Sequence, residues 1–215
     1  MPASQATHSA PPECQGAILA GGSAVRFGGQ PKGLRTVGGQ RILDRLVEAF
    51  LAGLGRLPLL VANDSEAPGW RHDLRVVSDL RPGAGALGGL FTAVTLAPAP
   101  VVCVAWDMPF VTGPLLTELA RGLGGFDAFL PESGGPRGLE PLCAAYGPAC
   151  ARAMLESLEA GDLRAVGFHD RVKVGILSLD RIRPLGDPGR LFFNVNTAED
   201  LAEADARWHR AASSR

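Results

Sequence analysis

The sequence contains few of the residues that mark several common classes of protein. Its 215 residues include only four cysteines, and no two of them are spaced as Cys-x-x-Cys. The cysteines therefore give no sign of a zinc site or a disulfide framework. No apolar run reaches the roughly 18 residues that a membrane-spanning helix needs. Lysine is also scarce, because only Lys32 and Lys173 are lysines among the 21 basic residues.

Charge is nearly balanced, and the formal net charge is −1. This balance argues against a partner nucleic acid held by bulk electrostatics. A hydrophobic content of 46% is typical of a soluble globular protein, and the length suits one well-cored domain. Residues 1–14 are polar and lack the charged start and apolar core of a secretory signal. We expect a disordered tail over 1–14 and one domain over 15–212, in a reducing cytoplasm.

Apolar patterns typical of strands alternate with patterns typical of helices along the chain. This alternation predicts an α/β fold with a mostly parallel sheet and helices on both faces. The expected strands are 17–20, 57–62, 74–77, 101–105, 127–130, 141–146 and 172–177, with a last apolar run at 192–196. The expected helices are 41–54, a segment ending near 96 after the glycine-rich stretch 81–89, 113–123, 150–160, and a final helix after Thr197.

The first expected strand opens into a glycine-rich loop that runs to about Gly33 and contains Arg26 and Lys32. Glycines let the backbone approach a phosphate closely, and the two cations add positive charge. Glycines also occur in ordinary surface loops, so the position after a strand and the cations favour phosphate binding. The loop is neither a Walker A motif, because Pro31 and Gly33 flank Lys32, nor G-x-G-x-x-G.

Asp107 follows the most apolar strand of the chain, and Asn63 and Asp79 follow two other expected strands. The carboxyl ends of parallel strands meet at one edge of a sheet, where ligands bind. A carboxylate at that edge suits Mg²⁺, a hard cation that prefers oxygen ligands. The alternative is that Asp107 caps a helix or forms a turn before Pro109.

Asn194 and Asn196 flank a single apolar residue, which places them on the same face of an extended strand. Side-chain amides there can bind a polar heteroaromatic substrate. The residues alone favour another interpretation, in which this segment is a strand end followed by a capping turn at Thr197. Thr197 to Asp200 matches a capping box. The four histidines have no metal-ligand spacing, and we find neither a Ser-His-Asp pattern nor a cysteine nucleophile.

Taken together, six blocks of sequence resemble the nucleoside triphosphate transferases of the MobA-like group, and most closely the molybdenum cofactor guanylyltransferases. The blocks span residues 17–201 in the order of that family, and their combination is specific although each alone is not. The blocks are Leu19-Ala20-Gly21-Gly22 with Arg26, Gly28 and Lys32; Asn63; Asp79 with Leu87-Gly88-Gly89-Leu90; Asp107-Met108-Pro109; Glu140-Pro141-Leu142-Cys143-Ala144; and Asn194-Val195-Asn196-Thr197 with Glu199-Asp200-Leu201.

The resemblance implies a Rossmann-like domain and a reaction in which GTP and molybdenum-loaded molybdopterin give the guanine dinucleotide cofactor and pyrophosphate. It implies catalytic roles for Lys32, Arg26 and Asp107, with Asp107 as the Mg²⁺ ligand. It places Asn194 and Asn196 on the pterin side, and it implies transient contact with molybdenum cofactor enzymes or chaperones. The nucleotide-binding positions that it implies are Leu19, Ala20, Gly21, Gly22, Lys32, Asn63, Asp79 and Asp107.

Two positions depart from the family pattern. Pro31 stands where an acidic residue is usual, and Ala86 stands where many members have proline. Four rivals remain: a cytidylyl-transferring sister enzyme, a sugar-phosphate nucleotidylyltransferase, a paralogue with another phosphorylated acceptor, and a non-catalytic homologue. The first tends to carry Ala-Ala-Gly in place of Ala20-Gly21-Gly22, the second is usually longer, and the last would have lost Lys32 or Asp107.

Overall fold

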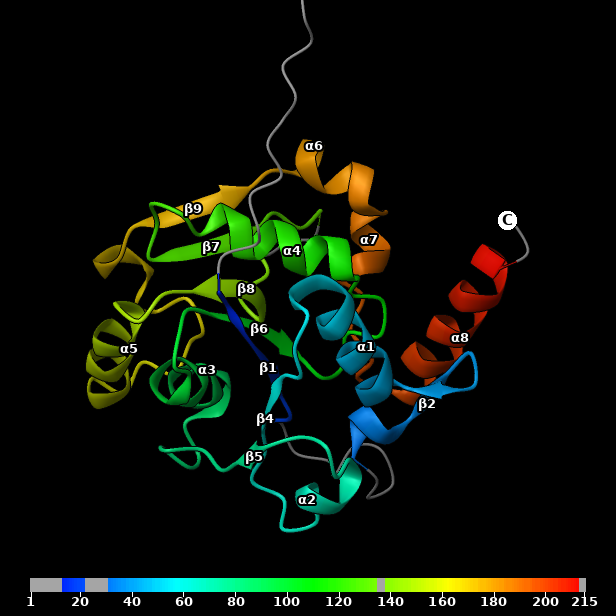
Figure 1. The fold of residues 1–215 in the computed structure, drawn as a ribbon, viewed down its shortest axis with the longest axis horizontal. Coiled ribbons are helices and arrows are strands. Elements are labelled where there is room, and N and C mark those ends of the chain that lie inside the picture. Colours follow the sequence, from blue (N-terminus) through cyan, green and yellow to red (C-terminus); the bar gives the residue numbers. More distant parts are fainter. Residues whose placement is uncertain (1–12, 22–30, 135–137, 213–215) are drawn as a thin grey trace, which may run out of the picture.

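The computed structural model describes residues 13–21, 31–134 and 138–212. Its centre is a seven-stranded sheet in the order β5-β4-β1-β6-β8-β7-β9 (Figure 1). Strand β8 runs antiparallel to both of its neighbours, and the remaining neighbouring pairs are parallel, which confirms the mostly parallel sheet. The strands are β1 (Gln15–Leu19), β4 (Leu59–Val61), β5 (Val76–Val77), β6 (Val101–Ala105), β7 (Ala128–Pro131), β8 (Cys143–Tyr146) and β9 (Val174–Leu177).

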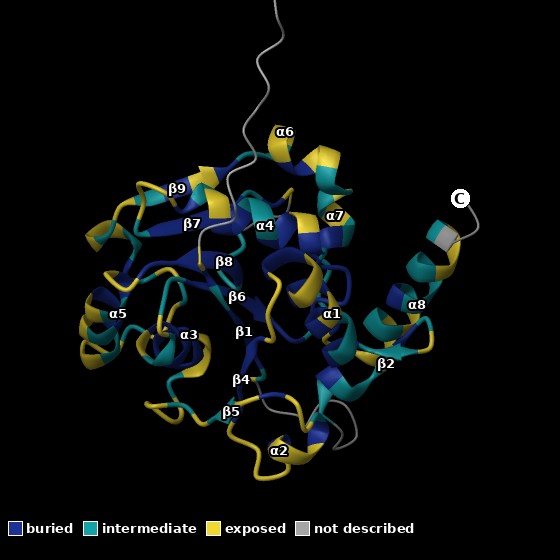
Figure 2. Ribbon diagram, viewed as in Figure 1, coloured by how far each residue is buried: buried dark blue, intermediate teal, exposed yellow. Residues whose placement is uncertain are grey.

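Helices cover both faces of this sheet, as the alternating pattern predicts. Helices α1 (Ile42–Leu54) and α4 (Gly113–Gly122) lie on one face, and α3 (Gly85–Leu96) and α5 (Cys150–Glu159) lie on the other (Figure 1). Alternate residues of β1 point to opposite faces. Ile18 therefore joins the core under α1 and α4, and Leu19 joins the core under α3. The strands are buried throughout the centre of the molecule (Figure 2).

The longest helix, α8 (Ala198–Ala212), lies beside a small antiparallel hairpin of β2 (Thr36–Val37) and β3 (Gln40–Arg41) (Figure 1). The Gly38 N–H in the hairpin donates to the Asp205 carboxylate of α8 at 2.7 Å. The capping box is confirmed, because the Asp200 N–H donates to Thr197 Oγ1 and the Asp200 carboxylate accepts the Thr197 N–H.

Several short elements connect the main ones, and the sequence patterns do not predict them. They are η2 (Lys32–Leu34), α2 (Ala67–Trp70), η3 (His169–Arg171), α6 (Leu179–Ile182), η4 (Arg183–Leu185) and α7 (Pro188–Leu191).

The apolar run 192–196 is not a strand, which corrects the expectation that Asn194 and Asn196 share a strand face. The reason is a tertiary contact, because the Val195 N–H donates to the backbone oxygen of Asp107 at 2.8 Å. The segment is thereby joined to the turn after β6 and forms no strand ladder.

All four cysteines are free and buried. Burial raises the pKa of the Cys103 thiol, and it raises the pKa of Cys150 to about 12. Such thiols stay protonated near neutral pH, as is typical of small core residues and not of nucleophiles. Within the described ranges, we find no helix with the length and apolar character to cross a bilayer.

Candidate active site

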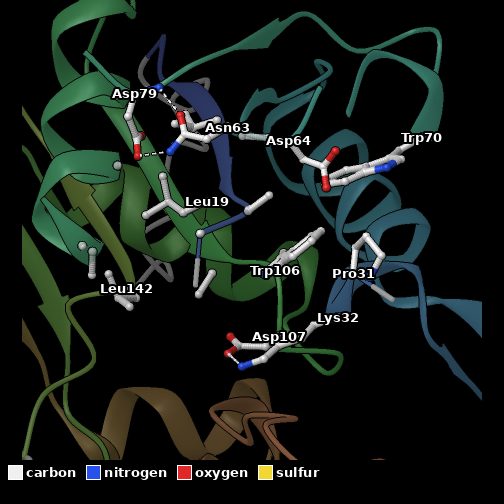
Figure 3. Close-up of a pocket in the computed structure, with 18 of the residues that line it drawn as sticks. Leu19, Pro31, Lys32, Asn63, Asp64, Trp70, Asp79, Trp106, Asp107 and Leu142 are labelled. Carbon is white, nitrogen blue, oxygen red and sulfur yellow. Dashed lines mark hydrogen bonds and ion pairs between the residues drawn. The ribbon is translucent and has the colours of Figure 1, made fainter. Parts of the chain in front are cut away.

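A cavity of about 640 Å³ lies at the carboxyl ends of the central strands (Figure 3). Leu19 at the end of β1 is level with Val61 of β4 and Ala105 of β6, so the three strands end at the same edge. The residues that line the cavity are Leu19, Ala20, Gly21, Pro31, Lys32, Val61, Ala62, Asn63, Asp64, Trp70, Asp79, Gly83, Gly85, Ala86, Gly89, Ala105, Trp106, Asp107 and Leu142.

One end of the cavity holds a polar pair that is already hydrogen-bonded. The Asn63 side-chain amide donates to Asp79 Oδ2 at 2.7 Å, and the Asp79 N–H donates to Asn63 Oδ1 at 2.8 Å (Figure 3). The next residue is fixed too, because the Leu80 N–H donates to the buried hydroxyl of Thr92 at 2.9 Å. Thr92 lies inside the apolar helix α3, and no sequence pattern singles it out.

The glycine-rich stretch before α3 forms the wall beside this pair. Gly83 and Gly85 have φ values of +79° and +59°, a left-handed conformation that glycine adopts at little cost. The turn directs the N-terminus of α3 toward the cavity, where Gly85, Ala86 and Gly89 line it. The N-terminus of a helix carries partial positive charge, so this wall favours electron-rich or anionic ligand groups.

The other end of the cavity holds two opposite charges that lie close together without a hydrogen bond between them. Lys32 begins η2 and Asp107 follows β6, and their side chains are 14% and 17% exposed. Lys32 Nζ lies 3.9 Å from Asp107 Oδ2, which is longer than a hydrogen bond (Figure 3). Burial raises the pKa of Asp107, and the positive charge of Lys32 partly opposes that rise.

Asp107 fits a metal ligand. Its buried Oδ1 has no hydrogen-bond partner in the described structure, and such an orphaned charged oxygen is costly unless a cation meets it. In the part of the chain that the structure describes, no three or more His, Cys, Asp and Glu side chains are grouped so that they could hold a metal ion. A metal held by Asp107 would thus take most of its ligands from phosphate oxygens and water, which is the usual arrangement for Mg²⁺.

Two tryptophans that the sequence patterns do not identify support this end. Trp106 stacks on Trp70, with ring centroids 5.2 Å apart and planes 22° apart. The Trp106 ring also packs on Gly33, where an added Cβ would lie only 2.4 Å from a ring atom. Gly33 follows Lys32 and Trp106 precedes Asp107, so this packing joins the backbones that carry the two charged groups. The sequence signal for Trp106 is its adjacency to Asp107, and Trp70 is adjacent to no predicted site residue.

The two asparagines near α8 have different surroundings. Asn196 Oδ1 accepts a hydrogen bond from Lys32 Nζ at 2.8 Å. The Asn194 amide instead donates to the backbone oxygen of Phe192 at 3.0 Å. Of these two asparagines, Asn196 is the one that is hydrogen-bonded to a side chain lining the cavity.

Most of the site residues predicted from the sequence meet in this one cavity, and Asn63 and Asp79 touch each other. The cavity also contains Pro31 and Ala86, the two departures from the family pattern. Gly22 and Arg26 lie outside the described residues. The predicted residues that line the cavity are Leu19, Ala20, Gly21, Lys32, Asn63, Asp79 and Asp107.

This arrangement suits a ligand with two unlike halves. The Asn63–Asp79 pair and the Lys32–Asp107 pair lie at opposite ends of the cavity (Figure 3). The first pair offers hydrogen-bonding groups in a fixed geometry. The second offers an ammonium and a carboxylate that are not in hydrogen-bond contact. A heterocyclic base at one end and metal-bound phosphates at the other satisfy both.

The chain is similar to known proteins in both sequence and structure. The family model of the MobA-like NTP transferase domain matches residues 16–172. A relative from Pelotomaculum thermopropionicum, named "Probable molybdenum cofactor guanylyltransferase", is 36% identical over 193 residues, or 89% of this chain and 92% of the relative.

Solved structures show the same fold. The crystal structure of molybdopterin-guanine dinucleotide biosynthesis protein A from Archaeoglobus fulgidus has a TM-score of 0.78 and 25% identity, and the match covers 91% of this chain and 99% of that one. The 2-C-methyl-D-erythritol 4-phosphate cytidylyltransferase from Thermus thermophilus has a TM-score of 0.66 at 18% identity, over 92% and 99% of the two chains. The second likeness concerns the fold alone.

Proposed function

Because this chain belongs to the MobA-like NTP transferase family, and is therefore a nucleotidyltransferase, we propose that it transfers GMP from GTP to molybdenum-loaded molybdopterin. The products are the guanine dinucleotide cofactor and pyrophosphate. The observation that carries this proposal is the cavity itself, because seven of the positions implied by the family resemblance line it together. The relative that is 36% identical carries the name of this activity.

We place the guanine at the Asn63–Asp79 end of the cavity. Asn63 uses its oxygen and its amide within the pair, which leaves the Asp79 carboxylate held in one orientation. A fixed carboxylate at a base-binding wall can accept hydrogen bonds from a donor edge of a purine. A base that lacks matching donors would leave the remaining acceptor positions of this carboxylate without hydrogen bonds, and this difference supports strong discrimination.

We place the phosphates at the Lys32–Asp107 end. A terminal phosphate oxygen of the acceptor forms a bond to the α-phosphorus of GTP. The bond from that phosphorus to the oxygen bridging to the β-phosphorus breaks, and pyrophosphate leaves with that oxygen. Lys32 places a positive charge beside the phosphate oxygens, and we assign the same task to Arg26, which lies outside the described residues. No covalent enzyme intermediate is needed.

Asp107 holds Mg²⁺ in this proposal. When bound, the ion supplies positive charge against the negative charge that gathers on the phosphate oxygens during transfer. Asp107 sets the place of that charge through a backbone fixed by Val195 and by the packing of Trp106 on Gly33. The contribution of the protein is then mostly positioning.

We place the molybdopterin on the side of Asn194 and Asn196, next to the phosphate end of the cavity. The segment that carries them is bonded through Val195 to the backbone of Asp107, so an acceptor held there lies close to the metal-binding carboxylate. We assign the reaction to the cytoplasm, where free cysteines such as the four buried ones remain reduced.

The test supplies the enzyme with Mg²⁺, molybdenum-loaded molybdopterin and either GTP, CTP or ATP, and identifies the products by mass spectrometry. We expect the guanine dinucleotide and pyrophosphate, with kcat/KM for GTP at least about a hundredfold above that for CTP or ATP. Preferred formation of the cytosine dinucleotide would identify a cytidylyltransferase. Turnover of GTP only with a different phosphorylated acceptor would identify a paralogue.

A further inference from the structure

Lys32, the lysine of the phosphate end, has a neutral direct partner. Its Nζ donates to Asn196 Oδ1 at 2.8 Å, across 164 residues of sequence, while the Asp107 carboxylate is 3.9 Å away. Charge alone would favour the carboxylate as the closer partner. The structure shows the opposite, because Lys32 makes its hydrogen bond to the uncharged amide and its ion pair with Asp107 is longer than a hydrogen bond.

The position of Asn196 is fixed from both sides. The N–H of the preceding, fully buried Val195 donates to the backbone oxygen of Asp107 at 2.8 Å. The N–H groups of Asn196 and Thr197 both donate to Asp200 Oδ2 at 2.9 Å, in the capping box of α8. The amide that meets Lys32 is thus carried by backbone tied to the metal-binding residue and to a helix end.

A neutral, fixed acceptor is well suited to holding a phosphate-binding lysine. The lysine side chain has four rotatable carbon–carbon bonds, so fixing it costs conformational entropy. An ammonium has three N–H donors, so one bond to Asn196 leaves two for phosphate oxygens. A carboxylate in the same place would neutralise the ammonium and compete with the phosphates, whereas the amide leaves its charge intact.

We propose that Asn196 is a positioning residue for the nucleotide half of the reaction, which holds the Lys32 ammonium where the triphosphate binds. The inference rests on the proposed function only in placing phosphates at the Lys32 end. It depends neither on the base nor on the acceptor, and it gives Asn196 a task that is complete before any acceptor arrives.

The test is a double-mutant cycle on phosphate binding, without any acceptor. Wild type, Asn196→Ala, Lys32→Ala and the double variant are titrated by calorimetry with Mg²⁺-bound inorganic tripolyphosphate and with Mg²⁺-GTP. We expect Asn196→Ala to weaken binding of both probes by about five- to tenfold, the scale of one hydrogen bond to a charged group at an exposed site. In the Lys32→Ala background, Asn196→Ala should cause no further loss.

Gln40→Ala is the control, because Gln40 also carries a side-chain amide, which donates to Glu48 in α1 instead of contacting Lys32. Its affinity for tripolyphosphate should equal that of wild type. Asn196 is exposed, so its replacement leaves the core intact, and circular dichroism verifies that each variant is folded.

Unchanged or tighter binding by Asn196→Ala would overturn the proposal, as would an equal loss in the two Lys32 backgrounds or a wild type that binds neither probe. Failure of the proposed function is distinguishable from these outcomes. A turnover preference for CTP or ATP would refute guanylyl transfer, while the coupling measured with base-free tripolyphosphate would stand.

Discussion

The two ends of the cavity hold their polar groups in opposite ways. At one end, Asn63 and Asp79 exchange two hydrogen bonds of 2.7 and 2.8 Å. At the other end, Lys32 and Asp107 are 3.9 Å apart, and Asp107 Oδ1 has no hydrogen-bond partner in the described structure. The first end is complete without a ligand, whereas the second leaves a carboxylate oxygen unpaired.

From this difference we infer that the Asn63–Asp79 end recognises the base and the Lys32–Asp107 end carries out the transfer. Groups paired with each other keep one geometry, and that geometry can select between bases by their hydrogen-bonding edges. Charges that lack a hydrogen bond to each other in a largely buried site gain the most when a metal and phosphates bind, because little solvent screens them there. Variants at the second end should therefore lower the rate of transfer as well as the affinity for phosphates, whereas variants at the first end should change the choice and affinity of nucleotide with little effect on the rate.

The largest effect is expected at Asp107. Asp107→Asn removes the metal-binding charge while keeping the shape of the side chain, and kcat should fall by about 10²–10³-fold or more. Steady-state kinetics over a range of Mg²⁺ concentrations measures this fall. Asp180→Asn serves as control, since Asp180 is exposed and pairs with Arg183 on α6 and η4. A folded Asp107→Asn enzyme with normal turnover would refute the metal assignment.

Lys32→Arg is expected to have the second largest effect. It keeps the charge but replaces a compact ammonium with a broad planar group, in a site where Nζ must meet Asn196. The loss in transition-state stabilisation should be roughly 2 kcal/mol, or about 30-fold in kcat/KM. Lys173→Arg is the matched control, because Lys173 lies over the Phe126 ring at 5.2 Å. If Lys32→Arg turned over at the wild-type rate, Arg26 would become the better candidate for the main cation beside the phosphates.

Gly33→Ala tests whether packing holds the charged end together. The added Cβ would lie 2.4 Å from the Trp106 ring, so the ring or η2 must move. We expect about 1–3 kcal/mol of destabilisation, as for other overpacked sites, together with about a tenfold loss of kcat. Thermal unfolding and kinetics measure the two effects. Gly69→Ala has open space around its Cβ and should leave stability nearly unchanged. Equal melting temperatures and equal kcat for Gly33→Ala and Gly69→Ala would show that the packing of Trp106 on Gly33 does not hold the charged end together.

A smaller effect is expected at the recognition end. Asp79→Asn removes the negative charge and replaces one acceptor oxygen with an NH₂ donor, so only one oxygen remains to be shared between Asn63 and the base. KM for GTP should rise by about tenfold, and the preference for GTP over ATP should narrow, with little change in kcat. Kinetics with both nucleotides tests this expectation. A fall in kcat at unchanged KM would place Asp79 at the reacting phosphates instead.

The smallest effect concerns stability and pH in metal-free protein. Burial raises the pKa of Asp107 above its ordinary value of 3.8, so its charged form is disfavoured in the folded state. The resulting destabilisation is absent below the ordinary value and develops as pH rises through the raised pKa. Asp107→Asn should therefore be more stable than wild type near neutral pH, and their melting temperatures should converge on acidification. A neutral-pH melting temperature below that of wild type would contradict this.

The parts of the site that follow strands could be predicted from the sequence. Asn63, Asp79 and Asp107 come after apolar runs, and parallel strands bring their carboxyl ends to one edge. The capping box at Thr197 and Asp200 could also be predicted, because its hydrogen bonds link residues three apart. These features depend on local patterns and on one general property of parallel sheets.

The parts that depend on tertiary contacts could not be predicted. The segment 192–196 has strand-like composition, yet the bond from Val195 to Asp107 joins it to a turn. The Lys32–Asn196 bond joins residues that are 164 positions apart. Trp70 at the end of α2 stacks on Trp106, which follows β6, and no periodicity encodes that approach. Local sequence gives the residue types of the site, and long-range packing sets which of them touch.

The most direct test of this account is a crystal structure with Mg²⁺ and a GTP analogue whose α,β-bridge cannot be cleaved. We expect the guanine against the Asn63–Asp79 pair, the metal on Asp107 Oδ1, and Lys32 Nζ hydrogen-bonded to both Asn196 and a phosphate oxygen. A guanine at the Lys32–Asp107 end, beside Trp70 and Trp106, would contradict this placement of the nucleotide. A metal that does not contact Asp107 would contradict the metal assignment.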